Sequence, residues 1–105
     1  MDKKHFFLKL IGHRPTFPQD ITEEERKIML VHRDYWMEFM NKGILLIYGP
    51  VFAPEATFGM GVVEADSLEE VNSMIEKHPA VINKLGFYEI YPMRAIYPQN
   101  LHSTR

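Results

Sequence analysis

Apolar residues recur along this chain with two different periods, which divide it into predicted strands and helices. Short segments dense in aliphatic and aromatic residues predict four strands, at residues 5–13, 44–48, 58–65 and 87–97. Longer segments with apolar residues every three or four positions predict two helices, at residues 22–42 and 66–77, and a further helical turn at 81–85. The predicted order is therefore β-α-β-β-α-β.

Residues that start and stop helices support these boundaries. Thr22 with Glu25 forms a capping box, and Asp20 with Glu23 forms a rival one. Gly43 is a natural stop after the first helix. The second helix opens on the cap signature Asp66-Ser67-Leu68-Glu69-Glu70 and is broken at His78-Pro79. Loops are expected at 14–20, which holds two prolines, and at 51–57, where Gly49-Pro50 closes the preceding strand.

This order is typical of the α+β ferredoxin-like fold, a four-stranded antiparallel sheet with two helices on one face. Pro92 lies inside the last predicted strand, which indicates an edge position or a bulge. Two helices leave the other sheet face open, yet the first strand is apolar on both sides: Phe6, Leu8 and Leu10 alternate with Phe7 and Ile11. We therefore expect a homodimer whose sheets pack face to face.

Composition narrows the class of protein. A chain of 105 residues with 46% hydrophobic residues predicts one domain over 1–105, with an ordered core at about 5–98 and a polar tail at 99–105. A net charge of -2 without a basic run argues against nucleic acid as a partner. The absence of cysteine excludes disulfides and thiolate chemistry. No apolar stretch is long enough for a membrane span and the N-terminus lacks signal-peptide features, so we expect a cytoplasmic protein.

His32 is the most informative candidate for chemistry. At 100° per residue it falls in the middle of the apolar side of the first predicted helix. The neighbours on that side are Ile28, Met29, Val31, Tyr35, Trp36, Phe39 and Met40. An imidazole directed into a core is costly unless it is satisfied or used. One interpretation is a core histidine bonded to a carbonyl or carboxylate; the other is a proton donor or acceptor whose pKa burial would lower.

Several motifs in register with His32 resemble the YciI-like (YCII-related) family of small dimeric α/β-barrel proteins. They are Gly43 eleven residues later, Gly49-Pro50 after the next strand, His78-Pro79-Ala80-Val81 and Tyr88-Glu89-Ile90-Tyr91-Pro92-Met93. The resemblance covers roughly residues 6–97 and implies a ferredoxin-like dimeric barrel with an active site built on a His–Asp pair. It places the family histidine at His32. Some members that degrade aromatic compounds are dehydrochlorinases, and the wider superfamily includes lactone isomerases and monooxygenases.

This chain departs from the family at the second site residue, because the family aspartate falls on His78. His78 continues the apolar stripe of the second helix, so it is placed to face His32, although a histidine there is also favourable against the helix dipole alone. A neutral imidazole cannot stabilise an imidazolium as a carboxylate does. Either Glu25 or Glu64 substitutes, or the pair is a relay or weak metal site, or activity is lost.

No metal or cofactor is expected. A metal at His32 and His78 needs a third ligand, and His5 and His13 are about 26 Å apart along one strand, so they cannot both join one site. Serine nucleophiles are poorly placed. Gly59 and Gly61 share a strand face and leave room there, either for a helix aromatic such as Trp36 or for a ligand.

Candidate substrate-binding residues flank this site. Arg14 follows the first strand and Arg94 interrupts the last; either is suited to hold an anion, and the alternative for both is an exposed side chain. Tyr35 and Trp36 flank His32 as core aromatics or as pocket walls. Leu30 and Met37, on the opposite side of the helix, are compatible with a dimer of dimers.

Three functions fit these residues. The first is a small-molecule enzyme without cofactor, in which His32 acts as general acid or base in an elimination or isomerisation. The second is a non-catalytic ligand-binding or interaction module that has lost the His–Asp pair. The third is a haem-linked or cofactor-free monooxygenase of the same barrel type.

Overall fold

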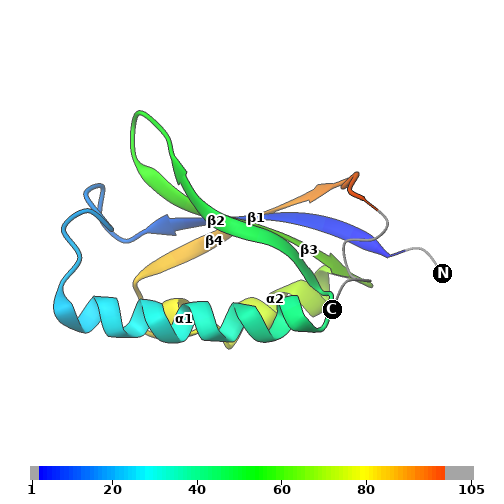
Figure 1. The fold of residues 1–105 in the computed structure, drawn as a ribbon, viewed down its shortest axis with the longest axis horizontal. Helices are drawn as coiled ribbons and strands as arrows, with labels where there is room; N and C mark the ends of the chain where they lie inside the picture. Colours follow the sequence, from blue (N-terminus) through cyan, green and yellow to red (C-terminus); the bar gives the residue numbers. More distant parts are fainter. Residues whose placement is uncertain (1–2, 99–105) are drawn as a thin grey trace.

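The chain folds into two layers, a twisted four-stranded sheet and a layer of helices beneath it (Figure 1). The computed structural model describes residues 3–98. The elements are β1 (Lys4–Gly12), α1 (Glu23–Asn41), β2 (Leu45–Phe52), β3 (Thr57–Ala65), α2 (Leu68–Glu76), α3 (Pro79–Ile82) and β4 (Gly86–Met93). The strand order is β2-β3-β1-β4 with all neighbours antiparallel, which confirms the predicted ferredoxin-like fold. Among the described residues, no helix is both long and apolar enough to cross a membrane.

The predicted signals set both ends of α1. The Thr22 side chain accepts from the Glu25 backbone while the Glu25 carboxylate accepts from the Thr22 backbone, so this capping box is formed. At the other end Gly43 adopts a positive φ of 79°. Its N–H donates to the Met40 carbonyl, and the Ile44 N–H donates to the Phe39 carbonyl. These two bonds are the Schellman motif, which glycine permits at low cost.

The register of β1 assigns side chains to the two faces of the sheet. Phe6, Leu8 and Leu10 are buried toward the helices. Their core partners from the helices are Trp36, Val71 and Met74. Phe7 and Ile11 lie on the other face, which no element of residues 3–98 covers (Figure 1).

Three predicted boundaries need correction. β2 does not close at Gly49-Pro50 but continues to Phe52, because β2 is an edge strand, where a proline without N–H is tolerated. β4 ends at Met93 rather than residue 97, since Met93 pairs with His5 and β1 begins at Lys4, which leaves nothing to pair with further residues. The extra helical turn begins at Pro79 rather than at residue 81, as suits proline in a first turn.

Two side chains of the predicted apolar stripes are exposed. Val31 on α1 is 54% exposed and Leu68 on α2 is 49% exposed. Each lies at the border of its stripe, where the helix surface turns away from the sheet. Pro92 lies in β4, an edge strand, as its sequence position indicated. The predicted tail at 99–105 lies outside the described residues.

Candidate active site

A cavity of about 310 Å³ lies between α1 and the helix side of β1, β2 and β3. Its walls are almost entirely apolar. From α1 come Met29, His32, Arg33 and Trp36, and the loop after β1 adds Phe17 and Pro18. The sheet contributes Leu8, Leu10, Gly12, Leu45, Tyr48, Gly49, Pro50, Thr57, Phe58, Gly59, Met60, Gly61 and Tyr88. Such a cavity has the volume and composition typical of a small-molecule site.

Two glycines on β3 make part of this space. Gly59 and Gly61 pair with Leu10 and Leu8 of β1, so they occupy the helix side of the sheet. A Cβ atom at either position would come to 3.4 Å from a leucine side chain and would otherwise project into the space. The two glycines line the same cavity as Trp36. Trp36 therefore forms a wall of the space beside the glycines but does not fill it.

His32 lies in the wall of the cavity, projecting from the middle of α1. Its Nδ1 atom is buried and has no hydrogen-bond partner, which among the described side chains is true of no other buried nitrogen or oxygen. Burial lowers the pKa of His32 from its ordinary 6.5 to about 4. The ring is therefore neutral at neutral pH, with one nitrogen available as a proton acceptor.

His78 packs directly against His32. The ring centroids are 4.4 Å apart and the planes meet at 75°, an edge-to-face contact. The His78 side chain is completely buried, and burial followed by the charge of the neighbouring His32 lowers its pKa to about 3. Two adjacent imidazoles in a dry environment resist protonation together, so both rings are uncharged near neutrality.

A hydrogen-bonded chain holds His78 in place. The Trp36 Nε1–H group donates to the Tyr88 hydroxyl at 3.0 Å, and that hydroxyl lies 3.2 Å from His78 Nε2. Because the hydroxyl oxygen already accepts from Trp36, its own proton is available to His78 Nε2. Burial raises the pKa of Tyr88, which keeps the phenol protonated. The chain thus contains no net charge.

Neither candidate carboxylate reaches this pair. Glu25 bonds Arg14, and Glu64 accepts from the Tyr97 hydroxyl at 2.7 Å and lies 3.1 Å from His5. No cluster of three or more metal-ligating side chains occurs within residues 3–98.

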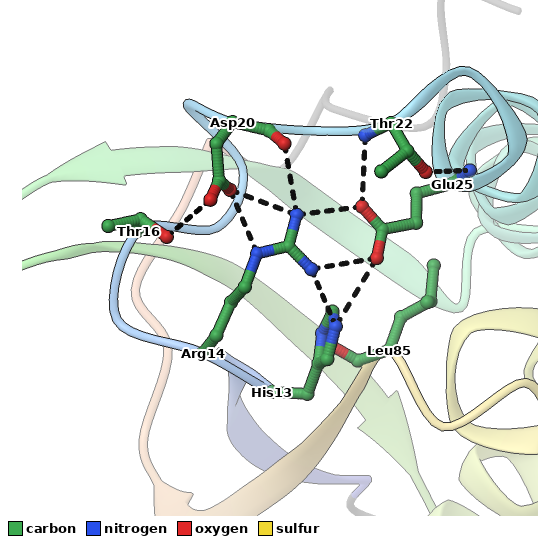
Figure 2. Close-up of polar contacts among 7 residues, drawn as sticks. All are labelled: His13, Arg14, Thr16, Asp20, Thr22, Glu25 and Leu85. Carbon is green, nitrogen blue, oxygen red and sulfur yellow. Dashed lines mark hydrogen bonds and ion pairs between the residues drawn. The ribbon is translucent and has the colours of Figure 1, made fainter.

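Arg14 lies in a separate hydrogen-bonded network, which joins the loop after β1 to the N-terminal end of α1 (Figure 2). Its guanidinium donates to both oxygens of Glu25 at 2.8 Å and to Asp20 at 2.9 Å. His13 joins through its contact with Glu25 at 3.3 Å. Hydrogen bonds from Arg14 are the largest cause that lowers the pKa of Glu25, to about 2. Arg14 is thus already paired with two carboxylates, and it does not line the cavity of His32.

This network has an indirect connection with the cavity. It fixes the loop between β1 and α1 whose Phe17 and Pro18 form part of the cavity wall. Arg14 therefore holds the wall of this cavity in position and does not itself line it.

The remaining predicted residues differ in whether they line the cavity. Trp36 lines the cavity, whereas the Tyr35 hydroxyl donates to the Met74 carbonyl at 2.7 Å and its ring packs edge-to-face on His78. Arg94 is exposed just beyond the end of β4 and does not line the cavity. The structure therefore brings together His32, His78 and Trp36 and leaves both predicted arginines outside.

Tyr88 and Arg33 are two of the cavity residues to which no role was assigned from the sequence. Tyr88 reaches His78 only because β4 pairs with β1 in a register that sets Tyr88 opposite Leu10. Arg33 lines the cavity beside His32. Its position directly after His32 is the one signal in the sequence that could have identified it.

Comparisons with known proteins agree with this architecture. The family model described as YCII-related domain matches residues 6–96. A solved structure, 5-chloro-2-hydroxyhydroquinone dehydrochlorinase (TftG) from Burkholderia phenoliruptrix AC1100 in complex with 2,5-dihydroxybenzoquinone, is similar at a TM-score of 0.65 and 21% identity. The match covers 85% of this chain and 93% of that one. A search of curated protein sequences gives no match.

Proposed function

This chain belongs to the YCII-related domain family, and from that premise we propose that it is a cofactor-independent small-molecule enzyme of the lyase or isomerase type. His32 is the general base or acid. The observation that carries the proposal is a neutral imidazole in the wall of an apolar cavity of about 310 Å³. A neutral imidazole accepts a proton directly, and an apolar wall excludes water that would compete for it.

The proposed step is a proton transfer coupled to rearrangement of the substrate. A C–H or O–H bond of the bound molecule breaks and its proton moves to the lone pair of His32. The electron pair left behind forms a new double bond. In an elimination the leaving group departs with its own electron pair; in an isomerisation the proton returns to a different atom. Since Nδ1 is sealed in the protein, we assign the acceptor role to Nε2.

His78 and Tyr88 act as positioning residues in this scheme. The His78 ring packs on the His32 ring and is held by the Tyr88 hydroxyl, so it restricts how His32 can turn. It brings no negative charge, and therefore it does not stabilise the imidazolium that forms. We expect His32 to be a weaker base than a histidine backed by aspartate.

The substrate proposed is a compact, single-ring compound. The similar dehydrochlorinase was solved with 2,5-dihydroxybenzoquinone, a planar ring. A cavity of about 310 Å³ lined by Trp36 and the glycines of β3 has room for a single-ring molecule.

The test measures turnover and binding separately. Purified protein is incubated with 5-chloro-2-hydroxyhydroquinone and the released chloride is measured, while binding of 2,5-dihydroxybenzoquinone is followed by calorimetry. His32→Gln should reduce chloride release at least about a hundredfold, the lower range for loss of a general base, with the fold preserved. The matched control is His5→Gln, on the other face of the sheet, which should change neither. Equal chloride release by wild type and His32→Gln would exclude His32 as the catalytic base.

A second function has one specific observation in its favour. The buried Nδ1 of His32 has no acceptor, so the group that would orient a catalytic histidine is missing. A ligand-binding module that has lost its catalytic pair would show this geometry. It would bind 2,5-dihydroxybenzoquinone in a Trp36-dependent manner and release no chloride from the chlorinated probe.

The proposed assembly is a homodimer formed through the uncovered sheet face. Ile47 of β2 and Phe87 and Tyr91 of β4 are about half exposed there, at 56%, 54% and 48%. Exposed apolar side chains gathered on one face favour association. The exposed Leu30 and Met37 on the outer side of α1 support further pairing of dimers.

A further inference from the structure

The cavity carries an electrostatic bias toward anions. Among the described residues that line it, Arg33 is the one with a formal charge, and no carboxylate lines it. The other polar groups, His32, Tyr48, Thr57 and Tyr88, are neutral near pH 7. A ligand that enters therefore meets one positively charged side chain in the lining and no negatively charged one; Asp34, beside Arg33, lies outside the lining.

Arg33 lines the cavity although its side chain is 61% exposed, so it is accessible both to the cavity and to solvent. It follows His32 on α1, and Tyr48 lies across from it on β2. Its charge reaches Tyr48, where it opposes the effect of burial, which raises the pKa of that phenol. The two side chains are therefore near one another in the wall of the same cavity.

The charge of Arg33 remains available to a ligand. Its one ion pair among the described residues is with the adjacent Asp34, at 3.8 Å, and both side chains are mostly exposed, at 61% and 73%. An exposed pair at this distance contributes little and is readily replaced. Arg14 is the opposite case, because two carboxylates already occupy its guanidinium.

We propose that the cavity selects small planar anions, with Arg33 and Tyr48 holding the negative group while the ring extends between Trp36 and Gly59 and Gly61 toward His32. This assignment rests on the proposed function and names its substrate class: ring compounds with a carboxylate or an acidic, ionised hydroxyl. Transfer of such an anion into an apolar space is costly without a countercharge. A guanidinium supplies one with paired donors that match two oxygens.

The test compares probes that differ only in charge. Dissociation constants for benzoate and for neutral, isosteric benzamide are measured by calorimetry at pH 7 on the full chain, with 2,5-dihydroxybenzoquinone as a second anion. Benzoate should bind about tenfold or more tightly than benzamide, the effect of one charge-assisted hydrogen-bonded contact. Equal affinities, or no binding of either anion, would overturn the proposal.

Variants assign that preference to Arg33. Arg33→Gln should raise the dissociation constant of benzoate about tenfold and leave that of benzamide within about twofold. Asp34→Asn, which removes the competing carboxylate, should tighten benzoate binding. Arg26→Gln on the same helix removes an arginine that does not line the cavity, and it should have no effect. A benzoate affinity equal in Arg33→Gln and Arg26→Gln would exclude Arg33 as the anion site.

These outcomes separate this proposal from the enzymatic one. If benzoate binds with the expected dependence on Arg33 but no chloride is released, the anion site stands and the enzymatic function fails. If His32-dependent chloride release occurs without any preference for anions, the enzymatic function stands and the anion site fails.

Discussion

At the scale of single residues, the site is defined by what surrounds His32. An unpartnered buried polar atom is costly and is rare in folded proteins. Nδ1 of His32 is such an atom, and the residue beside it is an uncharged imidazole. The structure therefore places a histidine in the cavity wall without the acceptor that a carboxylate would provide.

Replacement of His78 by aspartate should supply the acceptor that His32 Nδ1 lacks. In His78→Asp a carboxylate next to His32 would accept from Nδ1–H and stabilise the imidazolium, so the pKa of His32 should rise from about 4 by about two units or more. The measurement is an NMR titration of the imidazole resonances. His78→Asn is the control, because it offers an acceptor of similar shape without charge and should move the pKa much less. A pKa of His32 equal in both variants would show that the two side chains are not coupled.

The low pKa values of the two histidines also predict how stability depends on pH. Both are below the unfolded value of about 6.5, so the unfolded chain binds more protons than the folded one as pH falls from about 6.5 toward about 4. The stability they contribute is present above pH 6.5 and is lost over that range. We expect the free energy of unfolding, measured in urea, to fall by on the order of 4 kcal/mol between pH 7 and pH 5, about half from each histidine.

The double variant His32→Gln/His78→Gln is the control for that measurement. Its free energy of unfolding should depend less on pH over the same range, because both imidazoles are removed. Glu25 adds no slope there, since its pKa is about 2. An equally steep decline in the variant would assign the pH dependence to other groups.

Sequence patterns identified some site residues and missed others for a physical reason. His32, His78 and Trp36 lie on helical stripes or at a helix end, and helical periodicity alone places them toward the sheet. Tyr88 depends on the pairing register of β4 with β1, which no local pattern determines. Arg14 and Arg94 were chosen as cations near strand ends, but whether a cation is already paired depends on segments distant in sequence, such as Glu25 for Arg14.

At the scale of elements, helix boundaries were predictable because capping residues determine them locally, as Thr22 and Gly43 do for α1. Strand boundaries were less so, because a strand ends where its partner ends. β2 continues beyond Gly49-Pro50 because β3 extends alongside it back to Thr57. The extension adds Gly49 and Pro50 to the cavity wall, so the error affected the site as well as the fold.

The glycines of β3 give a prediction at this scale. Gly61→Ala should leave the free energy of unfolding within about 1 kcal/mol, because the added methyl meets side-chain atoms at an ordinary 3.4 Å. The same methyl narrows the cavity and should weaken binding of 2,5-dihydroxybenzoquinone about tenfold. Chemical denaturation and calorimetry measure the two effects.

Gly86→Ala provides the contrast, because there a Cβ atom would come to 2.4 Å from the Ile11 carbonyl oxygen. That backbone collision should cost about 1–3 kcal/mol, while any ligand binding by the folded fraction is retained. If Gly61→Ala bound the probe as tightly as wild type, the ligand would not occupy the space beside β3.

At the scale of the whole molecule, the two faces of the sheet have different neighbours. The helix face is covered, whereas the opposite face is open along its length (Figure 1). Paired positions across the strands give this open face two apolar rows, since Phe7 lies between Val62 and Tyr91, and Ile11 is opposite Phe87. Lys9 interrupts it, and its ammonium lies over the Phe58 ring at 4.7 Å.

We expect this face to be the centre of a homodimer, because two such sheets bury each other's apolar side chains when they stack. Sedimentation equilibrium at micromolar concentration should give at least twice the mass of the 12.4 kDa chain. Phe7→Glu introduces a charge at the middle of the face and should give a monomer. Leu30→Glu is the matched control, since Leu30 is a 49% exposed apolar residue on the outer side of α1. It should leave the dimer intact, and a mass that fell from four chains to two would locate the contact between dimers there. A wild-type monomer under these conditions would contradict the sheet-to-sheet dimer.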